Sequence, residues 1–468
     1  MKKRTFRLPP TCALAFMIMM FCAVLTWLVP AGAFDVEKVG RMTKVIPGTY
    51  HLIDPNPVGP VDLLRLLMKG FQSVAQLIFM AFFCGAGVEA LERSEAVTIA
   101  FGKLGARNIN PYRIALGVMI FMTIGGATGV FANQLVAFAP LAMILARSIG
   151  FDNFSAVIII ITASYAGFNV GWANTFTIGI AQAIAELPLY SGFMVRVVLH
   201  ILNFGIVLFF GYRYIKGVKK DYTTSLSYRE GMKESDVLGM PEEKLQFAAS
   251  KDLTMRHVLS LASLMVTVAA IVVGSIFYNW RYDEIAISFF LMTLFCGFVN
   301  KMGIDGTTKA FLDGCAKMLI PAMIIGFSAG IGVVLKEGKI LNTIVYWLSI
   351  PMSYFKPILS ANFMFIANSL INFVIPSGSG QATAVMPLMV PVADLAGVTR
   401  QVAVLAYQFG DGFTNCIVPT SGTILGTLAI VGVEYGPYLK WYSKILACEF
   451  VLAVVALTFL QYIGWTGL

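Results

Sequence analysis

Short polar side chains gather at four places where long apolar stretches of this sequence are interrupted. The interruptions lie at 125–134 and 167–177 in the first half of the chain, and at 376–381 and 411–423 in the second half. Oxygen atoms of amides, hydroxyls and carboxylates can bind Na+ or a proton and orient a small polar substrate. We therefore predict that these side chains line one central pocket. The candidate binding residues are Thr128, Asn133, Gln134, Asn169, Asn174, Thr175, Ser377, Gly378, Ser379, Gly380, Gln381, Asp411, Thr414, Asn415, Thr420 and Ser421.

The backbone at these interruptions has chemistry of its own. A broken helix leaves N–H and C=O groups that lipid cannot satisfy, so such backbone is tolerated only inside protein or beside a water-filled cavity. A helix that restarts after a break points its positive N-terminus at anions, while the preceding helix end offers carbonyls to cations. The alternative is that small residues only permit close helix packing. Four breaks in matching positions favour a binding site.

Asp411 is the one acid that falls within the predicted breaks. A carboxylate at membrane depth is costly and is a functional candidate by default. It could take up a proton, hold Na+, or pair with a substrate amine or guanidinium; alternatively it caps a half-helix or faces a vestibule. No Arg or Lys lies in the four breaks, so a bound carboxylate would depend on helix termini. This balance tilts the prediction slightly towards amino acids over dicarboxylates.

The composition indicates a membrane protein. Of 468 residues, 58% are hydrophobic and 13% charged, and the mean hydropathy is +0.78, whereas soluble domains are about 25% charged. The net charge of +9 fits basic cytoplasmic loops, so we predict no nucleic-acid partner. The seven cysteines and three histidines lack the spacing of a metal site, which predicts no metal, no cofactor and no enzyme.

The fold class predicted is an all-α polytopic membrane protein with two re-entrant hairpins, at about 113–150 and 357–398, and two broken helices. A basic start, a long apolar run and Ala31-Gly32-Ala33 could also indicate a secretory signal, but the run is nearly of spanning length, and we interpret it as a retained helix. The spanning segments expected are 11–31, 73–92, 191–215, 257–279, 284–300, 317–336 and 438–463.

The two halves of the chain resemble each other. Gly85, Gly87, Val88 and Glu92 match Gly330, Gly332, Val333 and Glu337, and further matches recur at a nearly constant spacing, about 245 residues. An odd number of spans separates the equivalent segments, which makes the repeat inverted, a transporter signature. The predicted domains are 1–215 for the first repeat, 216–256 for a cytoplasmic linker and 257–468 for the second repeat. Glu92 and Glu337 lie at span ends, where we expect them to be interfacial.

At 376–388 the sequence resembles the YfcC/DcuC-type carriers of the ion transporter superfamily, and the likeness extends over nearly the whole chain. That group includes four-carbon dicarboxylate carriers and basic amino-acid antiporters. The resemblance implies a homodimer with a scaffold domain and an elevator-type transport domain. Hairpin tips in the superfamily often carry Ser-Asn-Thr, whereas here they read Ser377 to Gln381 and Ala132 to Gln134, so its Na+ sites do not transfer in detail.

The function predicted is an ion-coupled secondary active transporter of a small carboxylate or amino acid that works by alternating access. Its coupling ion is Na+ or H+, and its partners are the small-molecule substrate and membrane lipid. An arginine/ornithine-type antiporter is the alternative within transport, and a channel or an intramembrane enzyme are the alternatives from other classes. We expect a multi-pass protein of the bacterial inner membrane with a cytoplasmic N-terminus.

Overall fold

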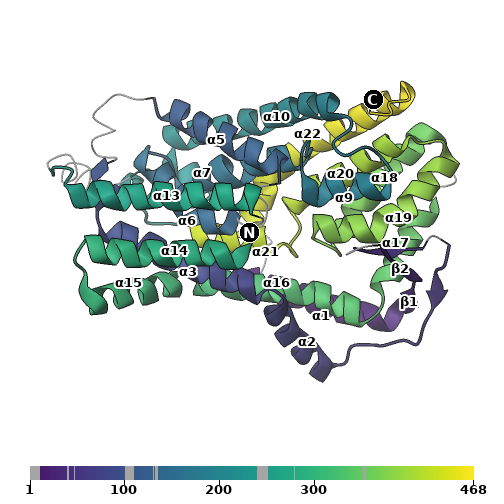
Figure 1. Ribbon diagram of the computed structural model, residues 1–468, viewed down its shortest axis with the longest axis horizontal. Helices are drawn as coiled ribbons and strands as arrows, with labels where there is room; N and C mark the ends of the chain where they lie inside the picture. Colours follow the sequence, from purple (N-terminus) through teal and green to yellow (C-terminus); the bar gives the residue numbers. More distant parts are fainter. Residues whose placement is uncertain are drawn as a thin grey trace, which may run out of the picture.

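The structure, a computed structural model, describes residues 11–39, 42–46, 48–97, 99–100, 110–129, 131, 135–239, 251–278, 280–351 and 355–467. Helices dominate it (Figure 1). In the first half they are α1 (Thr11–Leu28), α2 (Pro60–Ser73), α3 (Ala75–Arg93), α5 (Pro111–Ala127), α6 (Leu135–Ser148), α7 (Asn153–Ala156), the π-helix η1 (Val157–Thr162), α8 (Ala163–Phe168), the π-helix η2 (Thr175–Gly179), α9 (Ile180–Ile184) and α10 (Phe193–Lys220). After η3 (Tyr222–Thr224) and α11 (Glu234–Val237), the second half has α13 (Met255–Phe277), α14 (Tyr282–Val299), α15 (Gly303–Lys317), α16 (Leu319–Glu337), α17 (Leu341–Ser349), α18 (Pro357–Asn372), α19 (Gly378–Ala396), α20 (Arg400–Asn415), α21 (Gly422–Val431) and α22 (Tyr435–Tyr462).

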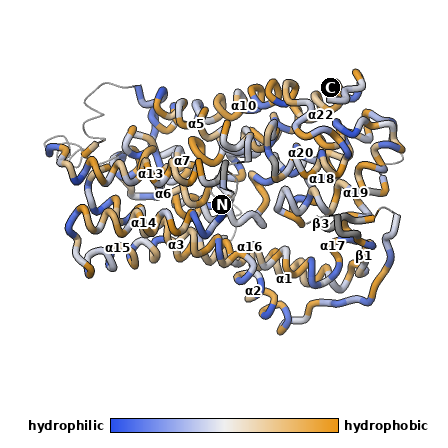
Figure 2. The backbone as a smooth tube through the Cα atoms, viewed as in Figure 1, coloured by the Kyte–Doolittle hydropathy of each residue, from blue (hydrophilic) through white to orange (hydrophobic). Residues whose placement is uncertain are grey.

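Helices lie over each of the seven predicted spanning segments. Among the described residues, five are long and apolar enough to cross a membrane, namely α3, α10, α14, α16 and α22. The outer face of α10 exposes Met194, Val198 and Ile201, and apolar residues extend along α10 and α22 (Figure 2). Exposed aliphatic side chains on long helices are expected where lipid replaces water as the solvent. The protein is therefore a multi-pass membrane protein.

Helices of equal length occupy matching places in the two halves. Helices α3 and α16 have 19 residues each, and α10 and α22 have 28 each. At the start of α10, Gly192 N donates to Gly467 O (2.8 Å). Near its end, the rings of Tyr214 and Trp441 lie 5.9 Å apart. Since Trp441 is near the start of α22, these two helices run antiparallel along their length.

Two close glycine crossings join the short amphipathic helices α2 and α15 to the long helices of the opposite half. A Cβ placed on Gly70 of α2 would lie 2.6 Å from the Cα of Gly330 in α16. A Cβ placed on Gly314 of α15 would lie 2.4 Å from the carbonyl oxygen of Gly85 in α3. Glycine is needed at both crossings because any side chain would force the helices apart. The two crossings occupy equivalent places in the two halves, because Gly85 matches Gly330 in the sequence repeat.

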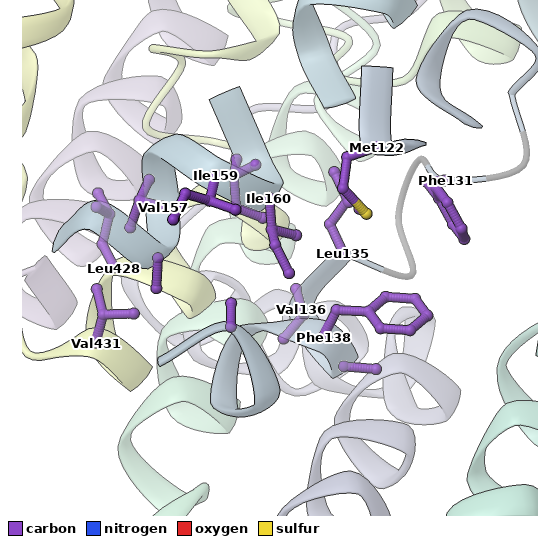
Figure 3. Close-up of a cluster of buried hydrophobic side chains, with 14 of the residues drawn as sticks. Met122, Phe131, Leu135, Val136, Phe138, Val157, Ile159, Ile160, Leu428 and Val431 are labelled. Carbon is purple, nitrogen blue, oxygen red and sulfur yellow. The ribbon is translucent and has the colours of Figure 1, made fainter. Parts of the chain in front are cut away.

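The two halves are also interlocked at the centre. Helix α6 of the first half packs on α21 of the second, and α19 of the second packs on α9 of the first. In the first of these contacts, Val136 of α6 and Ile160 of η1 share one apolar cluster with Leu428 and Val431 of α21 (Figure 3). Helices α3, α14, α15 and α16 lie along one edge of the bundle, and α10 and α22 along the opposite edge (Figure 1).

Two parts of the chain differ from the prediction. Four short strands lie between α1 and α2: β1 (Gly32–Ala33) pairs with β4 (His51–Leu52), and β2 (Val36–Val39) pairs with β3 (Met42–Val45), both antiparallel. Strands this short give no readable alternation of apolar and polar residues, which is why the all-α prediction omits them.

The linker predicted from 216 begins later, because α10 continues to Lys220. The residues after α10 are also packed on the protein rather than simply solvated. Ser225 Oγ donates to Asp152 Oδ2 (2.5 Å), and Arg147 Nη2 donates to the carbonyl of Gly239 (2.9 Å). The residues that extend α10 are mostly basic or small, so they add no apolar pattern to the sequence. The end of the apolar run therefore marks the end of the apolar surface and not the end of the helix.

Candidate functional site

The second hairpin places polar groups at the start of α19. Ser377 is its N-cap, and the hydroxyl accepts a hydrogen bond from Gly380 N (3.3 Å). Ser377 and Ser379 are exposed, whereas Gln381 is buried and donates to Asn368 Oδ1 (2.9 Å). Gly378, Ser379, Gly380 and Gln381 are thus the first turn of a helix and not an extended loop. The helix start presents its free N–H groups at this tip.

Asp411 lies next to this tip and is fully buried. A Cβ placed on Gly378 would lie 2.9 Å from Asp411 Oδ2 and 2.5 Å from Thr177 Cγ2, so the three residues are in contact. Asp411 Oδ1 accepts from Asn415 Nδ2 (3.0 Å). Asn372 Nδ2 donates to the Asp411 carbonyl (2.9 Å) and to Thr414 Oγ1 (2.8 Å).

Each of three residues named in these contacts or bonds has a buried oxygen with no hydrogen-bond partner among the described residues: Asp411 Oδ2, Thr177 Oγ1 and Asn372 Oδ1. Buried polar atoms in proteins almost always have a partner, and a buried carboxylate oxygen without one is especially costly. Three oxygens, one of them from an acid, are suited to a small cation or a proton. We call Asp411, Thr177 and Asn372 the oxygen cluster.

One predicted boundary was wrong here. The sequence places a break at 411–423, but α20 is helical through Asn415 and α21 begins at Gly422, so the break covers only 416–421. Gly410 and Gly412 signal a break only if nothing packs on them, and both pack closely on neighbouring backbone: Gly410 on Ser369 and Gly412 on Asn169. Asp411, Thr414 and Asn415 therefore project from an intact helix, which holds them rigidly.

The first break, at 169–174, faces the same region. Asn169 is fully buried, and its Nδ2 donates to Glu449 Oε1 (3.1 Å). Asn174 caps η2, with its Oδ1 accepting from Phe176 N (3.0 Å), while its Nδ2 has no partner within the described part of the chain. The tip of the first hairpin is close by, since a Cβ on Gly129 would lie 2.6 Å from Asn174 Oδ1.

The remaining predicted residues divide into four groups. Thr128 Oγ1 donates back to the preceding helix, to the carbonyls of Gly125 (3.1 Å) and Ile124 (3.2 Å). Thr420 Oγ1 donates to Phe373 O (3.4 Å), and Ser421 lies beside Tyr165, so both join the region of the second break. Thr175 begins η2. Asn133 and Gln134 lie outside the described residues.

The two breaks meet each other through buried contacts. Gln408 Nε2 of α20 donates to the carbonyl of Phe168 (2.6 Å), the last residue of α8. A Cβ on Gly412 would lie 2.5 Å from Asn169 Cα. The structure thus brings residues of the two breaks together, although they are far apart in the sequence. The π-helices η1 and η2 flank the first break, and such helices are frequent at functional sites.

Two buried charged residues near the breaks were missed by sequence reasoning. Glu449 in α22 is fully buried, and its Oε2 accepts from Tyr442 (3.2 Å). Arg196 in α10 is fully buried, and its Nη1 donates to Val170 O (3.3 Å) in the first break. The prediction considered charges within the breaks and the matched glutamates at span ends, but not charges inside the spanning segments. The signal that could have found both residues is an ionisable side chain inside a predicted spanning segment.

The sequence matches the C4-dicarboxylate anaerobic carrier family over residues 8–462. It is 28% identical to the "Putative basic amino acid antiporter YfcC" of Escherichia coli (strain K12), over 99% of this chain and 98% of that protein. It is 24% identical to an uncharacterized protein of Haemophilus influenzae, over 97% of each chain. The solved structure of the Alcanivorax borkumensis YdaH transporter aligns with 98% of this chain and 100% of its own, at 14% identity and a TM-score of 0.42.

Proposed function

Because the chain belongs to the C4-dicarboxylate anaerobic carrier family, and is thereby a secondary transporter, we propose that it carries a small carboxylate or amino acid with a coupling cation. Na+ or H+ is the coupling ion in this proposal, and the substrate site lies between the two breaks. The protein acts in the bacterial inner membrane, with its N-terminus in the cytoplasm, as a homodimer.

The oxygen cluster is the observation that carries this proposal. Asp411 is a fully buried acid whose Oδ2 lacks a partner among the described residues, and the unpartnered oxygens of Thr177 and Asn372 accompany it. A carboxylate at this depth requires a compensating cation or proton. Gly378 contacts both Asp411 and Thr177. A cation bound by the oxygen cluster would therefore lie next to the start of α19, at the tip of the second hairpin. Cation binding and substrate binding are coupled by this contact.

Alternating access is the mechanism that we propose. The antiparallel pairs and the mirrored glycine crossings support an inverted repeat, with α5–α6 and α18–α19 as re-entrant hairpins. Helix α5 has 17 residues and α6 has 14, which at 1.5 Å per residue makes each shorter than a hydrocarbon core of about 30 Å. A cavity of about 260 Å³ separates Glu89 and Lys317 on the scaffold side from Pro140 and Ile430 of the central helices. We propose that the central helices move against the scaffold helices α3, α14, α15 and α16 along this boundary.

Uptake into proteoliposomes tests the proposal. Purified protein is reconstituted with a Na+ or pH gradient, and uptake of labelled succinate, glutamate and arginine is measured. Asp411→Asn retains the shape and the bond to Asn415 but removes the charge, so we expect cation-driven uptake to fall by about 100-fold, the scale of removing a buried charge partner. Asp305→Asn, at an exposed acid of α15, is the matched control. Wild-type coupling and kinetics in Asp411→Asn would overturn the role of the cluster, and non-saturating flux would indicate a channel.

Antiport of basic amino acids is a second candidate. The Escherichia coli relative bears the name of a basic amino acid antiporter, and Asp411 could pair with a substrate amine or guanidinium instead of Na+. Counterflow separates the two candidates. An antiporter accumulates labelled arginine only when arginine or ornithine is present on the opposite side, whereas a symporter needs the ion gradient alone.

Labelling of single cysteines tests the hairpins. We expect reporters at positions 113 and 150 to react from the same side of the membrane, and reporters at 357 and 397 to react from the other. Labelling of 113 and 150 from opposite sides would exclude the first re-entrant hairpin and with it the inverted repeat.

A further inference from the structure

Arg196 is a buried cation with unused hydrogen-bonding capacity. It lies in the first turn of α10, fully buried, and its Nη1 donates to Val170 O (3.3 Å) just beyond the end of α8. Its Nε and Nη2 have no hydrogen-bond partner in the described part of the protein. A buried charged donor without an acceptor is strongly unfavourable, so these two N–H groups point to a missing acceptor.

The geometry of the two free donors specifies the acceptor. Nε and Nη2 lie on one edge of the planar guanidinium, and their N–H bonds point in parallel. This edge matches the two oxygens of a carboxylate in a bidentate arrangement, the strongest and most selective pairing that arginine makes. A single carbonyl or hydroxyl would satisfy only one of the two donors.

No buried acid among the described residues supplies this acceptor, since neither Nε nor Nη2 has a partner there. Glu449 binds Asn169 and Tyr442, and Asp411 Oδ1 binds Asn415. Gln408 contacts the same end of α8, where its Nε2 donates to Phe168 O (2.6 Å), and its Oε1 is also buried without a partner among the described residues. An acceptor for Arg196 and a donor for Gln408 are therefore both absent at one helix end.

Capping of α8 does not account for an arginine at this position. Helices α10 and α22 have 28 residues each, so Arg196 corresponds to Tyr438 of α22. The hydroxyl of Tyr438 donates to the carbonyl of Cys416 (2.7 Å), just beyond the end of α20. One neutral donor is sufficient to cap the equivalent helix end, so the two additional donors and the charge of Arg196 serve another purpose.

We propose that the Nε–Nη2 edge of Arg196 binds a carboxylate group of the transported substrate at the first break. This inference rests on the proposed function and names the group that the substrate must carry. Arg196 then holds the anionic end, while the oxygen cluster at Asp411 holds the cation. Gln408 Oε1 accepts a hydrogen bond from a hydroxyl or amino group of the same substrate.

Binding measurements on the full chain in nanodiscs test the assignment. The probes are succinate, L-glutamate and L-arginine, which all carry a carboxylate, with inorganic phosphate and chloride as other anions. Binding is read from the ligand-dependent rise of Tm. Arg196→Lys keeps the charge but removes the paired Nε–H and Nη2–H donors. We therefore expect binding at least tenfold weaker for every carboxylate probe that the wild type binds. Arg213→Lys, at an exposed arginine of the same helix, should bind as the wild type does.

The outcomes separate this inference from the proposed function. If the wild type binds and transports a carboxylate but Arg196→Lys binds it with unchanged Kd, the inference fails and the transport proposal stands. If phosphate or chloride competes as well as the carboxylate does, the site is a general anion site and the inference also fails. If the wild type binds no carboxylate probe, both fail.

A second measurement avoids dependence on the folding of the variant. The wild-type protein is treated with phenylglyoxal, which modifies arginine, and the modification of Arg196 is quantified by mass spectrometry with and without the bound carboxylate. We expect the carboxylate to protect Arg196 at least fivefold while leaving Arg213 unchanged. Equal modification of Arg196 in both samples, zero included, overturns the inference.

Discussion

The break after α8 and the break after α20 have the same backbone plan, but the two halves of the chain contribute side chains of opposite buried charge to this region. In the first half, Arg196 of α10 donates to the carbonyl of Val170. In the second half, the equivalent Tyr438 of α22 donates to the carbonyl of Cys416, and the buried acids Asp411 and Glu449 lie on helices of that half. The repeat therefore preserves the hydrogen bond that ends each helix but not the charge beside it.

Because of this difference, the centre of the protein is chemically asymmetric although its backbone is nearly symmetric. A symmetric backbone provides two equivalent helix ends, whereas the first half of the chain contributes the buried cation Arg196 and the second half contributes the buried acids Asp411 and Glu449. One pair of matching positions shows that the repeat does not preserve side chains. His200 of α10 accepts from Trp172 Nε1 (2.9 Å) in the first half, while the equivalent Tyr442 of α22 donates to Glu449 in the second half. A substrate with unlike ends would bind in one orientation.

After the loss expected for Asp411→Asn, the largest effect should come from neutralising the other buried acid of the second half. Glu449→Gln keeps an acceptor for Asn169 and Tyr442 but removes the charge, and we expect uptake to fall by about tenfold or more, since charges buried in spanning helices are retained for function. The exposed Glu434 just before α22 offers the control Glu434→Gln. Proteoliposome uptake is the measurement. If Glu449→Gln transports normally, only one acid of the second half contributes to function, and the contrast in charge is weaker than described.

The next effect tests whether the two glycine crossings, which occupy matching places in the two halves, contribute equally to stability. Gly314→Val and Gly70→Val insert side chains at the two mirrored crossings, where a Cβ would meet backbone at 2.4 Å and 2.6 Å. Overpacking of this kind costs about 1–3 kcal/mol, so we expect both variants to lower Tm by a similar amount. A Cβ on Gly217 would meet no atom within 4 Å, which makes Gly217→Ala the control. A large loss at one crossing and none at the other would show that the two contacts are not equivalent.

A smaller effect should follow loss of the caps at the two restarting helices. Asn174→Ala and Ser377→Ala each remove the acceptor for one free N–H, which costs about 1 kcal/mol. Because Asn174 is buried and Ser377 is exposed, we expect the larger loss of substrate or ion affinity from Asn174→Ala, with expression of both variants normal. Unchanged transport kinetics in both variants would show that neither Asn174 nor Ser377 belongs to the substrate or ion site.

The smallest effect concerns the ion pairs at the scaffold edge. Lys69 pairs with Glu337 (3.2 Å), with side chains 55% and 42% exposed, and such pairs contribute about 0–1 kcal/mol. Lys317 pairs with both Glu92 and the mostly buried Glu89. We therefore expect a barely measurable change in Tm for Lys69→Ala and a larger one for Lys317→Ala. The difference between the two should shrink in high salt if it is electrostatic.

Much of the architecture could be predicted from the sequence because lipid imposes a simple rule. A spanning helix must be long and apolar, so all seven predicted segments contain helices, and the matched glycines and glutamates pointed to equivalent helices in the two halves. The breaks were also recognisable, since Gly, Asn, Ser and Thr stand out in apolar sequence. Their exact limits were less accessible, because a glycine such as Gly412 serves equally well for a helix break or for close packing within an intact helix.

What the sequence by itself determined was membrane insertion, the helices and the four polar interruptions, because these depend on residues that are close along the chain. Only the tertiary structure decided which side chains complete the site. Arg196 reaches the first break from α10, and Glu449 reaches Asn169 from α22, 280 positions away along the chain. Such pairings depend on how antiparallel helices pack, and no local pattern encodes that. Burial then makes these charges depend on their neighbours, because a charge without water must find its partner within the protein or in a ligand.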